Sequence, residues 1–154
     1  MREYVEKLKR IIEERGIKAE HLSFETSCHS VAEAAETVGA EPEDFIKSIC
    51  MVGEGGEVIV AIVKGEDRAS TSRVAKALGV GRLRVAAPDE VLGLTGFPVG
   101  GTPGFGFEAT YLVDPKVLEK DVVYLGGGSD CALVRMSPRE LVWANGGRVV
   151  RVRK

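Results

Sequence analysis

A glycine-rich loop between positions 94 and 106 has the residue types that suit direct contact between a ligand and the main chain. It holds five glycines and two prolines, namely Gly96, Pro98, Gly100, Gly101, Pro103, Gly104 and Gly106. Glycine removes side-chain bulk and permits positive φ, while proline limits how far the loop can collapse. The composition favours a loop that binds a substrate through backbone N–H and C=O groups. A wide turn between two sheet elements explains it equally well.

The loop does not have the spacing of a nucleotide-binding motif. It contains no Gly-x-Gly-x-x-Gly ahead of a predicted helix, and no Gly-Lys-Ser or Gly-Lys-Thr follows it. A P-loop is therefore not expected. A second glycine run, Gly126-Gly-Gly-Ser-Asp130, predicts a tight reversal of the chain.

Lys47 is a candidate for chemistry whose meaning depends on its secondary structure. In a helix it would lie away from the apolar stripe of Phe45, Ile46 and Ile49, and would be an exposed surface lysine. In a strand it would share a face with Ile49 and Met51, so its ammonium would point toward an apolar interior. An inward lysine needs an anionic or strongly polar partner to offset desolvation. The residues alone leave both interpretations open.

The other reactive residue types do not assemble into a complete catalytic or metal-binding set. Cys28, Cys50 and Cys131 are far apart, and the chain has only two histidines, so neither a zinc site nor another cofactor is expected. Cys28 and His29 are adjacent, but adjacency does not by itself make a nucleophile–base pair. The position of His29, just before a predicted helix cap, favours exposure. The sequence offers no paired carboxylates and no Ser-His-Asp set.

Length and composition predict one globular domain over residues 1–154, with 44% hydrophobic and 29% charged residues. No apolar run approaches the roughly 20 residues that span a bilayer, and the charged, helical N-terminus differs from a signal peptide. We therefore expect a cytoplasmic protein without membrane contact. The absence of glutamine and the single asparagine, Asn145, suggest a thermophilic source.

The net charge of −2 provides no overall basic field, so DNA is not an expected partner and any RNA contact must be local. The one candidate is the C-terminal segment Arg148-Val-Val-Arg-Val-Arg-Lys154, which carries four cationic side chains. A solvated edge strand, whose charges discourage pairing between sheets, explains the same segment.

Apolar periodicity and turn residues divide the chain into short helices and strands. Helices are predicted over 2–15, 31–38, 71–78, from 88 to the glycine loop, and over 138–145, with helical turns from 42 and 115. Strands are predicted over 21–25, 46–52, 58–63, 83–86, 109–113, 121–125, 131–136 and at the C-terminus. Capping boxes at Ser30–Glu33 and Ser137–Glu140 begin two of the helices. Trp143 is expected in the core rather than as a stacking platform.

Strands joined sometimes by helices and sometimes by tight turns imply a mixed sheet. The predicted fold class is α/β (α+β), with a barrel-like curled sheet of about seven strands and short helices outside it.

Three segments together resemble the YbaK family of small proteins, which is related to the editing domain of bacterial prolyl-tRNA synthetases. The first is Phe45-Ile-Lys-Ser-Ile, similar to the family's strand of lysine followed by Ser or Thr. The second runs from Val74-Ala-Lys-Ala-Leu-Gly79 to Thr95-Gly-Phe-Pro-Val-Gly-Gly101 and its proline. The third is Gly126-Gly-Gly128 followed, after a strand, by Ser137-Pro138 and the last helix. The resemblance covers nearly all of residues 20–150.

The resemblance implies an aminoacyl-tRNA deacylase that acts in trans on a tRNA mischarged with a small amino acid, of the Ala-tRNA or Cys-tRNA type. It implies that Lys47 and Gly101 are catalytic and that backbone amides of the loop polarise the ester carbonyl. Substrate-binding residues would be Gly100, Thr102, Pro103, Gly104, Gly127, Gly128, Ser129 and Asp130. Asp130 and His29 are weak candidates for a general base, and a positioned water helped by the substrate's ribose hydroxyl would suffice for a labile ester.

Two further consequences of the resemblance bear on partners and substrate. Many family members have Gly-x-x-x-Pro in the loop, whereas Gly100-Gly-Thr-Pro103 brings the proline one position earlier, which implies a different pocket size. The implied partners are aminoacyl-tRNA and an aminoacyl-tRNA synthetase. The alternative is a non-catalytic module that binds aminoacyl or nucleotide ends and associates with a synthetase.

Overall fold

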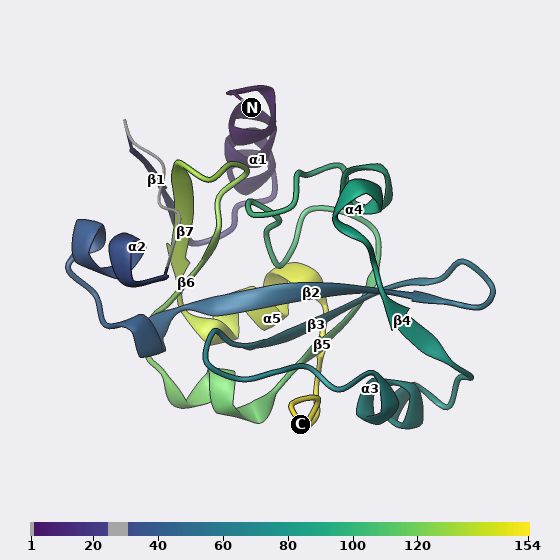
Figure 1. The fold of residues 1–154 in the computed structure, drawn as a ribbon. Coiled ribbons are helices and arrows are strands. Elements are labelled where there is room, and N and C mark those ends of the chain that lie inside the picture. The colour runs from purple at the N-terminus through teal and green to yellow at the C-terminus, as the bar shows by residue number, and fades with distance from the viewer. Residues whose placement is uncertain (1, 25–30) are drawn as a thin grey trace.

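Two β-sheets form the centre of the molecule (Figure 1). The computed structural model describes residues 2–24 and 31–154. The larger sheet has the order β4-β2-β3-β5-β8. Its strands are β2 (Ile46–Gly53), β3 (Val58–Lys64), β4 (Leu83–Val85), β5 (Thr110–Val113) and β8 (Arg148–Val149). β2 pairs antiparallel with β3 and β4, whereas β5 runs parallel to β3 and β8, so the predicted mixed sheet is confirmed.

The smaller sheet has the order β1-β7-β6 and is antiparallel throughout. Its strands are β1 (Ala19–Ser23), β6 (Val123–Gly126) and β7 (Ala132–Met136). An isolated parallel bridge between Phe45 and Tyr124, whose rings stack with centroids 5.1 Å apart, connects it to the start of β2. The described strands therefore form two sheets and do not close into a barrel, which corrects the prediction of a single barrel-like sheet.

Five short α-helices surround the sheets (Figure 1). They are α1 (Arg2–Glu14), α2 (Val31–Val38), α3 (Thr71–Leu78), α4 (Pro88–Thr95) and α5 (Pro138–Asn145), with 3-10 turns at Pro42–Asp44 and Pro115–Glu119. Side-chain caps begin two of them, since Ser70 accepts from Arg73 N in α3 and Ser137 from Glu140 N in α5. α3 and α5 match their predicted positions because a capping serine begins each helix and a glycine in the left-handed conformation, Gly79 or Gly146, follows its last residue.

The structure differs from the sequence-based predictions at three places. Trp143 is 63% exposed rather than buried, because it lies on the side of α5 that faces away from the core. The C-terminal strand is only Arg148–Val149, followed by an isolated bridge between Ala69 and Arg153. β1 begins at Ala19 rather than His21. Residues 25–30, which include Cys28, His29 and the predicted cap at Ser30, lie outside the described residues.

The hydrophobic core has two main parts, one on each face of the larger sheet. The first lies between the two sheets and includes residues of α1, α5 and the glycine-rich loop, among them Leu8, Phe97, Phe105 and Leu141. The second lies beneath α3, where Val74 packs against β3. No helix within residues 2–24 and 31–154 has both the length and the apolar character that a membrane span requires.

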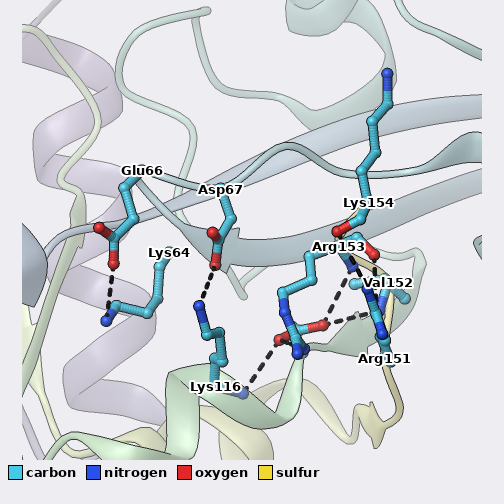
Figure 2. Close-up of polar contacts among 9 residues, drawn as sticks. Lys64, Glu66, Asp67, Lys116, Arg151, Val152, Arg153 and Lys154 are labelled. Atoms are coloured by element: carbon cyan, nitrogen blue, oxygen red, sulfur yellow. Dashed lines mark hydrogen bonds and ion pairs between the residues drawn. The ribbon is translucent and has the colours of Figure 1, made fainter.

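A buried carboxylate fastens the C-terminal segment to the end of β5. Figure 2 shows its partners Lys116, Val152 and Arg153. The Asp114 side chain is fully buried and accepts hydrogen bonds from the backbone N–H groups of Val152, Arg153 and Lys116 and from the Arg153 guanidinium, at 2.8–3.2 Å. Burial alone would raise the pKa of Asp114, but these four hydrogen bonds together lower it. Arg153, one of the four cations of the basic segment, is thus a structural residue.

The Asp114 contacts predict an acid-sensitive contribution to stability. A carboxylate with a lowered folded-state pKa stabilises the fold above its unfolded pKa of about 3.9, and this stabilisation is lost as the pH falls through the folded value. Asp114→Asn should lower the free energy of unfolding by about 2–3 kcal/mol at pH 7, because hydrogen bonds to a buried charge are lost. Urea unfolding of both proteins between pH 2 and 7 measures this. The difference between them should be constant above about pH 4 and shrink below it; a difference independent of pH would contradict the assignment.

Candidate functional site

A small cavity opens along one edge of β2. Its volume is about 260 Å³, just below the roughly 300–1,000 Å³ typical of ligand pockets, so it suits a small group rather than a whole nucleotide. Its walls come from β2, the end of β4, α4, the glycine-rich loop and the end of β6. The lining residues are Ile46, Lys47, Ser48, Ile49, Cys50, Val85, Ala86, Val91, Val99, Gly100, Thr102 and Gly126.

The cavity exists because one edge of β2 is only partly covered. Phe45 O accepts from Gly65 N at 2.8 Å, so the odd-numbered residues of β2 bond toward β3. Cys50 O accepts from Ala86 N at 2.9 Å, so the even-numbered residues bond toward the opposite edge. β4 pairs only with the last three residues of β2. The N–H and C=O of Ser48 therefore face an edge that β4 leaves uncovered.

The cavity has an exposed mouth and a buried floor. Val85 and Val99 stand at the mouth, where they are 54% and 56% exposed. Ile46, Cys50 and Val91 are buried and form the inner wall. The inner end of the cavity is thus largely apolar, and its mouth lies between two exposed valines.

The start of the glycine-rich loop is fixed by its neighbours. α4 ends at Gly96, which has a left-handed φ of 80° and donates to Leu92 O. Phe97, which follows, is fully buried. Lys7 of α1 lies 4.6 Å from the centre of its ring and donates to Gly96 O at 3.2 Å. The loop is therefore held against α1 before it reaches the cavity.

The middle of the loop is a tight turn that leaves two amides available. Gly101 N donates to Pro98 O at 3.1 Å, and Gly100 has a φ of 86°, as the third residue of a type II turn requires. Thr102 Oγ1 donates to the same carbonyl at 2.9 Å. In the part of the chain that the structure describes, the N–H groups of Gly100 and Thr102 meet no internal acceptor. These two amides belong to residues that line the cavity.

The two glycine runs pack backbone against backbone beside the cavity. Gly128 N donates to Gly101 O at 2.8 Å. A Cβ at Gly101 would lie 2.6 Å from the carbonyl carbon of Gly128, and one at Gly126 would lie 2.8 Å from the carbonyl carbon of Thr102. Glycine is required at both positions because no side chain fits between the loops.

His21 supports the second glycine run from β1. Its Nε2 donates to Gly127 O at 2.8 Å, and its Nδ1 lies 3.4 Å from Ser23 Oγ. Burial lowers the pKa of His21, so the ring is neutral near pH 7. His21 does not line the cavity and acts as a support for its wall.

Lys47 lies in strand β2, so a strand rather than a helix is confirmed as its secondary structure. Alternation places its side chain on the face of Ile49 and Met51, both of which pack in the core beneath α3. Lys47 is half-buried and lines the cavity. It has no hydrogen-bond or ion-pair partner among the described residues. It is the cationic residue among those that line this cavity.

The predicted site residues divide into three groups. Lys47, Gly100 and Thr102 line the cavity. Six further residues are buried and do not line the cavity, namely Gly101, Pro103, Gly104, Gly127, Gly128 and Ser129. Asp130 is exposed beyond the wall at the turn before β7 and does not line the cavity. The roles of all of these residues stay predictions.

Sequence reasoning did not select several residues of the cavity. Ser48 and Gly126 belong to two segments that resemble the editing family, Phe45–Ile49 and Gly126–Gly128, but neither residue was selected from them. The alternation of side chains along β2 was a signal that could have indicated Ser48. Val85, Val91 and Val99 gave no local signal, because only the packing of α4 against the edge of β2 brings them together.

The cavity has few titratable groups. Burial raises the pKa of the Cys50 thiol, so it is neutral at physiological pH. No cluster of three or more His, Cys, Asp or Glu side chains suited to a metal occurs within the described ranges.

A larger hollow of about 440 Å³ lies near Lys120, but that cation is bound by Glu43 and Asp44 at 2.9 Å each. The cavity at β2 is thus the candidate site with an unpaired cation and available amides.

The fold and the cavity define a small two-sheet α/β protein with a candidate site at the edge of β2. Residues 25–143 match the family described as "Aminoacyl-tRNA editing domain", and the chain belongs to this family. It is 31% identical to the uncharacterized protein YwhH of Bacillus subtilis over 120 residues, 77% of this chain and 76% of that protein.

Two further relatives connect the chain with prolyl-tRNA synthetase. The proline–tRNA ligase of Thermotoga neapolitana is 26% identical over 106 residues, which are 62% of this chain but only 18% of the ligase. A crystal structure described as a candidate trans-editing enzyme for prolyl tRNA synthetase superposes with a TM-score of 0.90 at 32% identity, covering 98% of this chain and 97% of that one. The predicted resemblance to the editing family is thereby confirmed.

Proposed function

We propose that this protein is an aminoacyl-tRNA deacylase that acts in trans, hydrolysing the ester of a tRNA mischarged with a small amino acid. The observation that carries the proposal is the cavity of about 260 Å³ at the edge of β2, which Lys47, Gly100 and Thr102 line. The Lys47 ammonium and the N–H groups of Gly100 and Thr102 have no partner among the described residues. The family and the structural relative support the same reaction class. The whole tRNA body would remain outside the cavity.

The proposed reaction uses the main chain to stabilise charge. The N–H groups of Gly100 and Thr102 hydrogen-bond the ester carbonyl oxygen, and they stabilise the oxyanion that forms when water adds to the carbonyl carbon. The C–O bond to the tRNA then breaks, the 3′ oxygen takes the proton that the attacking water gives up, and the amino acid leaves with the water's oxygen in its carboxyl group. The substrate's ribose hydroxyl positions the water. Lys47 binds a substrate oxygen, either a terminal phosphate or the carbonyl itself. Gly101 lies next to the lining residues Gly100 and Thr102, and the hydrogen bond that its carbonyl oxygen accepts from Gly128 N holds this part of the loop in place.

A non-catalytic binding module is the second candidate. The observation in its favour is that, among the residues that the structure describes, the cavity's lining includes no carboxylate or histidine that could act as a general base. Such a module would bind aminoacyl ends next to a synthetase and protect the ester rather than destroy it.

One experiment separates the two candidates. Purified protein is incubated with Ala-, Cys-, Ser- and Pro-tRNA, and the surviving ester is measured against spontaneous hydrolysis. We expect one small aminoacyl ester to be hydrolysed at least tenfold faster than Pro-tRNA. If every ester survives in the presence of folded protein, the deacylase proposal fails. Hydrolysis that is slower in the presence of the protein than in its absence would support the binding module instead.

A further inference from the structure

Two stretches of the chain carry a local excess of positive charge. Residues 68–73 and 148–154 contain six Arg and Lys residues and no Asp or Glu, whereas the whole chain has 23 acidic and 21 basic residues. Arg153 is bound to the buried Asp114 carboxylate, and the other five basic residues are exposed. We call these five the basic surface, and its members are Arg68, Arg73, Arg148, Arg151 and Lys154.

The fold brings the two stretches together. Ser70 N donates to Val152 O at 2.7 Å, and Lys154 N donates to Arg68 O at 2.8 Å. At the far end of α3, the Arg148 guanidinium donates to a helix carbonyl at 2.8 Å. The C-terminal segment therefore runs beside α3 (Figure 1), and cations that are far apart in the sequence share one surface.

The positive charge of the basic surface is not neutralised within the described part of the chain. Arg68, Arg73 and Lys154 have no side-chain hydrogen bond and no ion pair there. Figure 2 shows the Lys154 side chain extending away from the neighbouring polar contacts. Arg148 and Arg151 donate only to backbone carbonyls, which leave their net charge in place. Like charges so arranged repel one another, so a bound anion would stabilise this surface.

Protection of a sheet edge does not explain the basic surface. Charges on an edge strand discourage pairing between sheets, but Arg148 alone of the five residues lies in the edge strand β8. Elsewhere, surface cations such as Lys120 and Arg84 are paired with carboxylates. The basic surface has no such partner among the described residues, and an anionic ligand from outside the chain would supply the missing charge.

We propose that the basic surface binds the phosphate backbone of RNA, namely the body of the tRNA whose 3′ end enters the cavity. This inference rests on the proposed function, which makes a tRNA the substrate. Four of the five cations are arginines, whose guanidinium groups bind phosphate oxygens through two parallel hydrogen bonds. The surface lies on the same side of the larger sheet as the Lys47 side chain, because Val152 and Met51 belong to the same half of the core. A tRNA can therefore contact Lys47 and the basic surface from one side of the sheet.

The test measures binding of uncharged tRNA, so its result does not depend on hydrolysis. The full chain is titrated into fluorescently labelled tRNA at salt concentrations from about 50 to 200 mM. Arg68→Gln, Arg73→Gln and Lys154→Gln are combined in one triple variant, because these exposed side chains have no partner to lose. We expect about tenfold weaker binding at the lowest salt. The slope of log affinity against log salt should become shallower by about two to three, since each lost phosphate contact removes just under one unit.

A matched control removes the same charge from the opposite side of the larger sheet. The triple variant Arg10→Gln, Arg15→Gln and Lys18→Gln loses two arginines and one lysine that are exposed in α1 or just after it. α1 packs on the other half of the core, through Leu8. This variant should change the affinity by about twofold or less. Both triple variants should melt within about 2 °C of the wild type, because they alter only exposed side chains.

The possible outcomes separate this inference from its alternatives. Absence of tRNA binding by the wild type, wild-type affinity in the first triple variant, or equal weakening in both triple variants would overturn it. Displacement of the tRNA by poly-glutamate as effectively as by unlabelled tRNA would overturn it in favour of an acidic protein partner. If tRNA binding behaves as expected but no aminoacyl ester is hydrolysed, the proposed deacylase activity fails and the RNA-binding surface stands.

Discussion

Lys47→Ala is expected to lower the deacylation rate about 100-fold while leaving the fold intact. The loss follows from removal of the cation that binds a substrate oxygen, and deletion of a single group that stabilises transition-state charge costs on the order of 10²–10³ in rate. The fold should tolerate the change, since Lys47 has no ion pair or hydrogen bond among the described residues. The measurement is single-turnover hydrolysis of the preferred aminoacyl-tRNA, with melting temperature as the stability readout.

A matched control for Lys47 is available on the same side of the larger sheet. Lys76→Ala removes an exposed lysine of α3 that does not line the cavity, so it should change the single-turnover rate less than twofold. Lys47→Met keeps most of the apolar stem and removes the charge, and it should be as inactive as the alanine variant. Wild-type rates in both Lys47 variants would remove this residue from the proposed site.

The sequence predicted the local elements well because their signals are local. Ser70, Ser137 and the glycines that end α3 and α5 lie at the predicted helix ends. The hairpin between β2 and β3 follows from a β-branched run on the far side of a glycine turn. Such signals depend on a few neighbouring residues, and the structure retains each of them.

The arrangement of the sheets was less predictable because it depends on contacts between distant segments. Nothing local indicates that β1 pairs with β7 rather than joining the larger sheet, or that the sheets meet at Phe45 and Tyr124. Trp143 was misplaced for a related reason, since an aromatic residue on a short helix is usually buried. Its exposure depends on which side of α5 meets Leu8 and Phe105, and that is a tertiary property.

The candidate site was also predictable only in part, because some of its features follow from local sequence and others from tertiary contacts. The residue types of Lys47 and of the glycine-rich loop indicated chemistry, and the structure brings Lys47, Gly100 and Thr102 to one cavity. The sequence could not show that Gly101 N is already bonded to Pro98 O. The proposed oxyanion contacts therefore pass to the neighbouring amides, whose lack of internal acceptors becomes evident only in three dimensions.

Gly101→Ala is expected to lower the free energy of unfolding by about 2–3 kcal/mol and to abolish most deacylation. The added Cβ would lie 2.6 Å from the carbonyl carbon of Gly128 and 2.8 Å from Ser129 Cα, and all the nearest atoms are backbone. Because backbone cannot rotate away as a side chain can, the two loops must separate, with strain and loss of the Gly128 N to Gly101 O hydrogen bond. The separation would move the Gly100 and Thr102 amides away from the substrate.

Gly93→Ala separates this steric effect from the general cost of replacing a glycine. Gly93 lies within α4 with open space around its Cβ position, so alanine there should stabilise the protein by about 0.5–1 kcal/mol through helix propensity. The urea midpoints of the two variants should therefore shift in opposite directions from the wild-type midpoint. If Gly101→Ala unfolded at the wild-type midpoint, the inference that the close packing of the two glycine runs requires glycine at this position would be contradicted. If it were destabilised yet fully active, the runs would hold the fold together without positioning the amides, and catalysis would have to depend on Lys47 and the remaining walls of the cavity.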